Sequence, residues 1–123
     1  MHQYDPERAP NPEEWLELDE QERILLVEQY HRHSRAKLPN LTAHAVFHVI
    51  AENQIAEGLE PVLRAMARLS SEGLTRHDAV HAVASVVAVH IHDLFKTKDD
   101  VTASQARYYA AVERLNAKSW RAG

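Results

Sequence analysis

The sequence contains no cysteine, and this absence excludes several classes of site at once. Disulfides, zinc ribbons, iron–sulfur clusters and thiol nucleophiles all require cysteine. Glycine is also scarce: its three residues lie far apart, so a glycine-rich phosphate-binding loop is excluded as well. Any metal site in this chain must therefore use nitrogen and oxygen ligands.

A basic surface and a long apolar run are missing too. The 14 Lys and Arg residues are scattered among 18 Asp and Glu residues, and the net charge is −4, so we expect no nucleic-acid partner. The longest nearly apolar stretch, residues 82–89, is much shorter than the roughly 20 residues that cross a bilayer. The first residues also lack the basic start and apolar core of a signal peptide. We therefore expect no membrane partner and a cytoplasmic location.

What remains predicts an all-α protein, a compact bundle of about five to six helices in one domain over residues 1–123. The five prolines fall before or between apolar segments of helical period, and the loops between these segments are short. Residues 1–11 are expected to be an extended arm, and a C-terminal helix over 102–121 is expected as an added element. The expected helix starts are at Asn11, Asp19, Thr42, Pro61, Thr75 and Thr102.

Histidine is abundant, with nine residues, and several stand at helical spacing. His44 and His48 are four residues apart, and Glu52 extends the same row. Residues four apart in a helix lie on one face, one turn above the other. A pair of histidines at this spacing can bind one metal ion from a single helix.

Two other predicted helices carry similar rows. His77 and His81 repeat the spacing of four, and Glu28 and His31, three apart, share a face. Three helices could thus direct ligands at one centre. Neutral imidazoles and carboxylates suit iron, zinc, nickel or manganese. His77 lies in the first turn of its helix, where the helix dipole favours the neutral imidazole that a metal needs.

Spacing alone leaves an alternative open. Nine histidines scattered at random over this chain would give about 0.6 pairs at spacing four, so two pairs are a modest excess. A row of histidines that faces solvent is therefore an equally simple interpretation.

The motifs resemble those of an uncharacterised bacterial family of small helical proteins, a domain of unknown function. The similarity covers about residues 4–96, and its most specific parts are the two His-x3-His pairs and Glu52-Asn53-Gln54. It implies no activity, but it does imply that the hallmark positions of the family are His44, His48, Glu52, His77 and His81. This resemblance favours the metal site over a solvent-facing row.

A partial similarity links the chain to hemerythrin-like bundles, which bind metal through ordered His and Glu motifs. The shared order is His31, His48-x3-Glu52 and His77-x3-His81. The fourth element, His-x4-Asp, has no counterpart, because neither His90 nor His92 is followed by aspartate at that spacing. The similarity is therefore an analogy and implies no oxygen-carrier chemistry.

The sequence thus predicts a metal-binding helical bundle of unknown biochemical role. The expected ligands of its divalent metal ion, with iron or zinc favoured, are His44, His48, His77 and His81, completed by Glu52, Glu28 and His31. The sequence leaves open whether one ion or two bind, and whether the protein is an enzyme.

Two other functions are compatible with the same sequence. One is a metal-free homodimeric interaction module, which would pair through the apolar stripe of the C-terminal helix formed by Tyr108, Tyr109, Val112 and Leu115. The other is a pH sensor based on histidines that titrate near neutrality.

Overall fold

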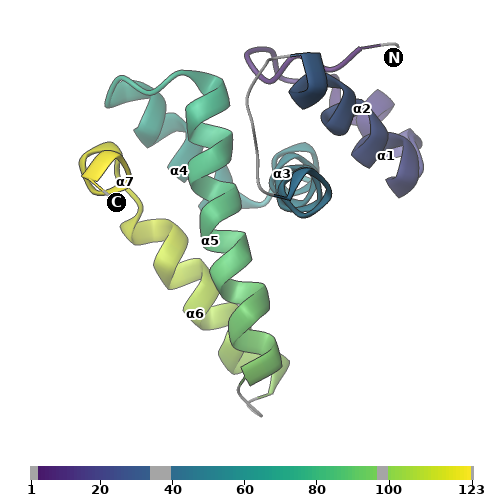
Figure 1. Ribbon diagram of the computed structural model, residues 1–123. Helices are drawn as coiled ribbons and strands as arrows, with labels where there is room; N and C mark the ends of the chain where they lie inside the picture. Colours follow the sequence, from purple (N-terminus) through teal and green to yellow (C-terminus); the bar gives the residue numbers. More distant parts are fainter. Residues whose placement is uncertain (1–2, 34–39, 97–99, 123) are drawn as a thin grey trace.

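The computed structural model describes residues 3–33, 40–96 and 100–122, and these residues confirm the all-α class (Figure 1). No strand occurs in these three ranges. The described residues form the helices α1 (Pro12–Glu17), α2 (Glu20–His33), α3 (Leu41–Ala56), α4 (Glu60–Ser71), α5 (Arg76–Lys96), α6 (Val101–Arg114) and α7 (Ala117–Ala122).

Three of the predicted helix starts are confirmed by their capping hydrogen bonds. The side chains of Asn11, Asp19 and Thr75 each accept a hydrogen bond from the backbone N–H three residues further on, at 2.8 to 3.1 Å. Such caps satisfy backbone donors that have no partner within the helix. Gly58 follows α3 with a φ of 75°, a left-handed conformation that glycine adopts without strain.

The predicted start of α3 at Thr42 is wrong by two residues. Asn40 caps this helix, because its side-chain oxygen accepts the Ala43 N–H at 3.0 Å. The Thr42 hydroxyl instead donates to a Glu28 carboxylate oxygen at 3.1 Å. The helix that starts at Asp19 is expected from the sequence to end near residue 37, which lies outside the described residues.

The C-terminal helix predicted over 102–121 is two helices rather than one. Leu115 has extended dihedral angles, which end α6, and the Asn116 side chain accepts the Ser119 N–H at 2.8 Å to begin α7. Asparagine competes with helix continuation in this way because its side chain replaces a backbone partner. This break is one reason why the helix count is higher than predicted.

The two helices α3 and α5 hold the other helices together. In Figure 1, α3 is seen along its axis, with α1 and α2 on one side of it and α5 on the other. Helix α3 packs against α1, α2 and α5, and α5 packs in turn against α4 and α6. Side chains from α2, α3 and α5 therefore meet between the two halves of the fold.

Hydrophobic residues fill the space on both sides of this meeting point. One cluster joins α3, α4, α5 and α6 around Val62, Val80, Val83 and Val112. Another joins the N-terminal segment to α1, α2 and α3 around Tyr4, Trp15, Val27 and Val49. Burial of these side chains supplies most of the stabilisation that holds the helices in place.

The apolar stripe of the C-terminal helix is part of the core. Tyr108 and Val112 are buried in the first cluster, and Tyr109 and Leu115 pack against it. The face of α6 that carries this stripe therefore packs inside the bundle.

Helix α5 is also long and apolar enough to cross a membrane, by length and composition only. The core helix of a soluble protein passes the same test. About a third of its most apolar window is buried, where α5 packs against α3, α4 and α6.

Truncation of Trp15 tests the packing of the N-terminal cluster. Trp15 is fully buried, and its indole N–H donates to the Asn53 side chain at 2.9 Å. We expect Trp15→Ala to lower the free energy of unfolding by about 3–5 kcal/mol in urea denaturation. The control is Leu25→Ala on α2, where the side chain is 48% exposed and the expected change is small. Equal effects of the two substitutions would contradict this packing.

Candidate metal centre

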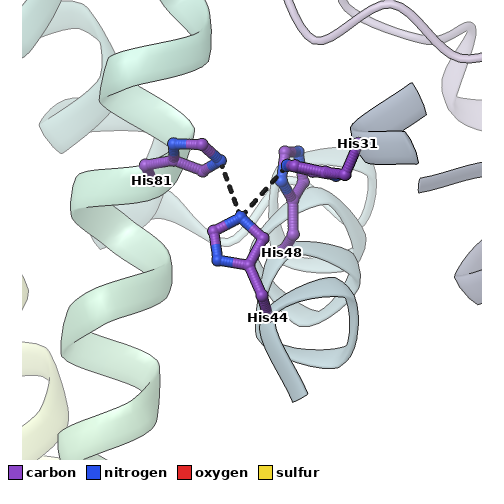
Figure 2. Close-up of side chains that lie close together, drawn as sticks. All are labelled: His31, His44, His48 and His81. Atoms are coloured by element: carbon purple, nitrogen blue, oxygen red, sulfur yellow. Dashed lines mark hydrogen bonds between the residues drawn. The ribbon is translucent and has the colours of Figure 1, made fainter. Parts of the chain in front are cut away.

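Four of the predicted ligands converge on one place. One ring nitrogen from each of four histidines lies within 4.8 Å of the other three: His31, His44, His48 and His81. Figure 2 shows these side chains reaching the same point from α2, α3 and α5. His31 and His48 are 3% and 0% exposed, and His44 and His81 are half-buried. The prediction that separate helices direct histidines at a common centre is confirmed for these four.

The ring nitrogens make more close contacts than linear hydrogen bonds can satisfy. His44 Nε2 lies 3.1 Å from both His31 Nε2 and His81 Nε2, and His81 Nε2 lies 3.0 Å from His77 Nε2. Each such nitrogen offers either one N–H or one lone pair. His44 Nε2 and His81 Nε2 each face two neighbours, so at most two of the three contacts can be linear hydrogen bonds. A cation among the nitrogens would offer the remaining lone pairs a partner.

The backbone fixes the tautomer of His31. Its Nδ1 lies 2.8 Å from the Val27 carbonyl oxygen, which can only accept a hydrogen bond. Nδ1 therefore carries the proton, and the lone pair is on Nε2, the nitrogen that faces His44. Metal-binding histidines are held in this way, with the second ring nitrogen donating to a carbonyl or carboxylate.

A buried chain of hydrogen bonds fixes the tautomer of His48. The Tyr4 hydroxyl lies 2.6 Å from His48 Nε2 and donates its own proton to Glu52. The Glu52 carboxylate also accepts two hydrogen bonds from the Arg76 guanidinium, at 2.7 and 2.8 Å. Because the Tyr4 proton is committed to Glu52, the phenol oxygen accepts from His48 Nε2–H. The lone pair of His48 is then on Nδ1.

His48 Nδ1 is the unsatisfied atom of this arrangement. It is buried and has no hydrogen-bond partner among the residues that the structure describes. A buried polar atom without a partner costs about 1–3 kcal/mol, and native proteins rarely retain one without a reason. A metal ion bound to Nδ1 would supply that reason.

Glu52, which the sequence predicts as a ligand, lies behind His48. Its carboxylate is engaged by Tyr4 and Arg76, and one oxygen is 4.0 Å from His48 Nε2. Burial raises the pKa of the Tyr4 phenol, and the neighbouring Glu52 raises it further, so Tyr4 stays protonated and continues to donate. Glu52 is not one of the four converging ligands. Its contacts are those of a group that orients a ligand.

His77, the fifth predicted histidine, borders the group. Its Nε2 lies next to His81 Nε2, and its ring packs edge-on against Tyr30 with 5.4 Å between ring centroids. Its backbone N–H donates to the Glu7 carboxylate at 3.0 Å, which anchors the first turn of α5. The set of nitrogens within 4.8 Å of one another does not include His77.

Glu28 also lies outside that set. Its carboxylate accepts a hydrogen bond from Thr42 and pairs with Arg32 at 3.9 Å. The prediction that Glu28 binds the metal stays a prediction, and these contacts give it no support.

The surroundings of His44, His48, His77 and His81 favour the neutral form of these imidazoles. Burial, together with the neighbouring imidazoles, lowers the pKa of His48 to about 2 and that of His81 to about 3. Burial also lowers the pKa of His44 and His77, again with help from other histidines. Imidazole must be neutral to bind a metal, so the lowered pKa values hold these four histidines in that form at neutral pH.

Two residues of this site have no role in the sequence-based ligand set. Tyr4 belongs to the predicted arm, whose sequence has no helical periodicity that could place it on a helix face. Arg76 precedes His77, and the spacing of possible ligands includes His77 but not Arg76. Both belong to the similarity described above, but that similarity assigns them no role. Their contact with Glu52 depends on how the N-terminal segment packs on α3 and α5.

The chain matches no protein-family model, and no curated protein and no solved structure matches it. The resemblances to the uncharacterised family and to hemerythrin-like bundles therefore stay predictions. The chemistry of the site has to be argued from its own residues.

The acid sensitivity of the metal-free protein tests the lowered pKa values. Unfolded histidines bind protons near pH 6.5, whereas the folded cluster resists protonation to much lower pH. Stability is thus complete above about pH 6.5 and falls below it, by up to about 1.4 kcal/mol per pH unit for each fully resistant histidine.

Urea denaturation in the presence of a chelator between pH 7 and 4.5 would measure this loss. In His81→Ala the decline should be shallower, because one resistant group is gone. Equal stability at pH 7 and pH 5 would mean that the cluster accepts protons freely.

Proposed function

We propose that this protein binds one divalent transition-metal ion through His31, His44, His48 and His81. One observation carries the proposal: four imidazoles from three helices converge, and the buried His48 Nδ1 has no hydrogen-bond partner among the described residues. The ligating atoms would be Nδ1 of His48 and Nε2 of the other three. The Tyr4–Glu52–Arg76 chain would then orient His48 from behind.

The spacing of the nitrogens favours some metals over others. Two nitrogens bound at right angles, with metal–nitrogen bonds of about 2.1 Å, lie about 3.0 Å apart, and at the tetrahedral angle they lie about 3.4 Å apart. The separations from His44 Nε2 to its two neighbours in the quartet are both 3.1 Å. This spacing favours a metal with more than four ligands, such as iron or nickel, over four-coordinate zinc.

Elemental analysis of purified, tag-free protein tests the proposal. We expect close to one metal ion per chain in the wild type and close to none in the double variant His44→Ala, His81→Ala. These two histidines are half-buried, so their truncation should leave more of the fold intact than truncation of His48.

The matched control is His92→Ala, which removes an exposed histidine from the same helix as His81. It should bind as much metal as the wild type. A metal content near zero in wild-type protein that has been reconstituted with iron, nickel and zinc in turn would refute the proposed function.

Substitution of Tyr4 tests the supporting hydrogen bonds. Tyr4→Phe keeps the buried ring but leaves His48 Nε2–H without its acceptor and Glu52 without one donor. Loss of such a supporting contact typically weakens metal binding by about 10–100-fold, which calorimetric titration would detect. Tyr109→Phe, on α6 and away from the cluster, is the control and should have wild-type affinity. An unchanged metal affinity in Tyr4→Phe would show that the hydrogen bonds from Tyr4 do not orient His48.

A metal-free homodimeric module stays the second candidate, because one end of the fold exposes apolar side chains. Leu94, Phe95 and Val101, where α5 ends and α6 begins, are 42%, 87% and 76% exposed. Figure 1 shows this end projecting away from α1 and α2. Analytical ultracentrifugation would favour this candidate if it gave a dimer that Phe95→Ser abolishes. A monomer at all concentrations would exclude it.

A further inference from the structure

We infer that the metal keeps a coordination position for a small exogenous ligand, water or a monoanion, and that His77 contacts this ligand rather than the metal. The inference rests on the proposed function, because it concerns the same centre. It distinguishes a reactive site from a closed ion that only joins helices.

The first observation is the uneven burial of the five histidines. His31 and His48 are buried, and the three that remain partly accessible are His44, His77 and His81. These three residues therefore lie on the side of the centre that borders solvent. A ligand that enters from solvent would meet the metal there.

The second observation is the number and charge of the donors. His44 Nε2 lies at near right-angle spacing from Nε2 of His31 and of His81, and four protein nitrogens leave a six-coordinate metal with two positions to fill. Imidazoles are uncharged ligands, and the Glu52 carboxylate behind His48 is paired with Arg76, so the charge of a divalent ion would not be balanced within its coordination sphere. An anion or a metal-bound hydroxide would reduce this charge.

The third observation limits the charge of the ligand. The carboxylates of Glu7, Asp78 and Asp5 act electrostatically on His77. Glu7 also accepts a hydrogen bond from the His77 backbone N–H. These carboxylates would repel an anion of higher charge, such as phosphate. A neutral molecule or a monoanion fits this side of the centre better.

The position of His77 gives it a role beside the metal. Its Nε2 lies 3.0 Å from His81 Nε2, while its backbone is tied to Glu7 and its ring rests on Tyr30. Once His81 gives its Nε2 lone pair to the metal, His77 Nε2 loses that partner but stays next to the coordination sphere. It can then form a hydrogen bond to the exogenous ligand.

Cobalt(II)-loaded protein titrated with azide tests the inference, because Co(II) absorption in the visible range reports coordination number. We expect the weak bands of a five- or six-coordinate ion and a saturable spectral change with azide. His77→Ala should bind Co(II) with wild-type stoichiometry and affinity but bind azide about tenfold more weakly, the loss expected for a hydrogen bond to a charged ligand. His77→Gln should recover part of this loss, and His92→Ala should behave as the wild type.

Three outcomes separate the claims. Intense tetrahedral bands that azide does not change would overturn the inference and leave metal binding intact. Loss of Co(II) from His77→Ala would overturn it too, because His77 would then be a ligand. Failure of wild-type protein to bind Co(II), iron, nickel or zinc would instead refute the proposed function itself.

Discussion

The fold brings the imidazole nitrogens of α2, α3 and α5 into mutual contact, and the rest of the molecule has to stabilise that arrangement. Neutral imidazoles that share a buried space cannot all pair with one another, since His44 Nε2 faces two others at 3.1 Å. Without a cation, His44 Nε2 can form a linear hydrogen bond to only one of these two, and His48 Nδ1 has no partner among the described residues. The hydrophobic clusters on either side of the histidines offset this cost.

Hydrogen bonds to the second ring nitrogens of His31 and His48 fix the tautomers of these two histidines. The Val27 carbonyl holds His31 in one tautomer, and the chain through Tyr4 and Glu52 holds His48 in another. Arg76 balances the charge of Glu52, so a fully buried carboxylate is accommodated. The N-terminal segment thus contributes to the site although it contains no predicted ligand, because Tyr4 packs against His48 and the Pro6 carbonyl accepts from Arg76.

Helical spacing predicts which side chains share a face of one helix, but it predicts little about the residues of other elements that contact that face. The helix class, most helix starts and the shared face of His44 and His48 follow from local rules, and the structure confirms them. Glu52 lies on that same face, as predicted, but Arg76 and Tyr4 stand opposite it. Spacing could not show this, because it gives the direction of a side chain and not its partner. The break at Asn116 differs from the single helix that the sequence predicts for a similar reason. The Asn116 side chain caps a new helix, although the apolar pattern continues beyond this residue.

The most direct test of the account is a crystal structure of reconstituted protein, with diffraction data collected on both sides of the absorption edge of the added metal. The account predicts one anomalous peak within bonding distance of His48 Nδ1 and of Nε2 of His31, His44 and His81. No peak at that point, or a peak bound only to histidines on the surface, would contradict it.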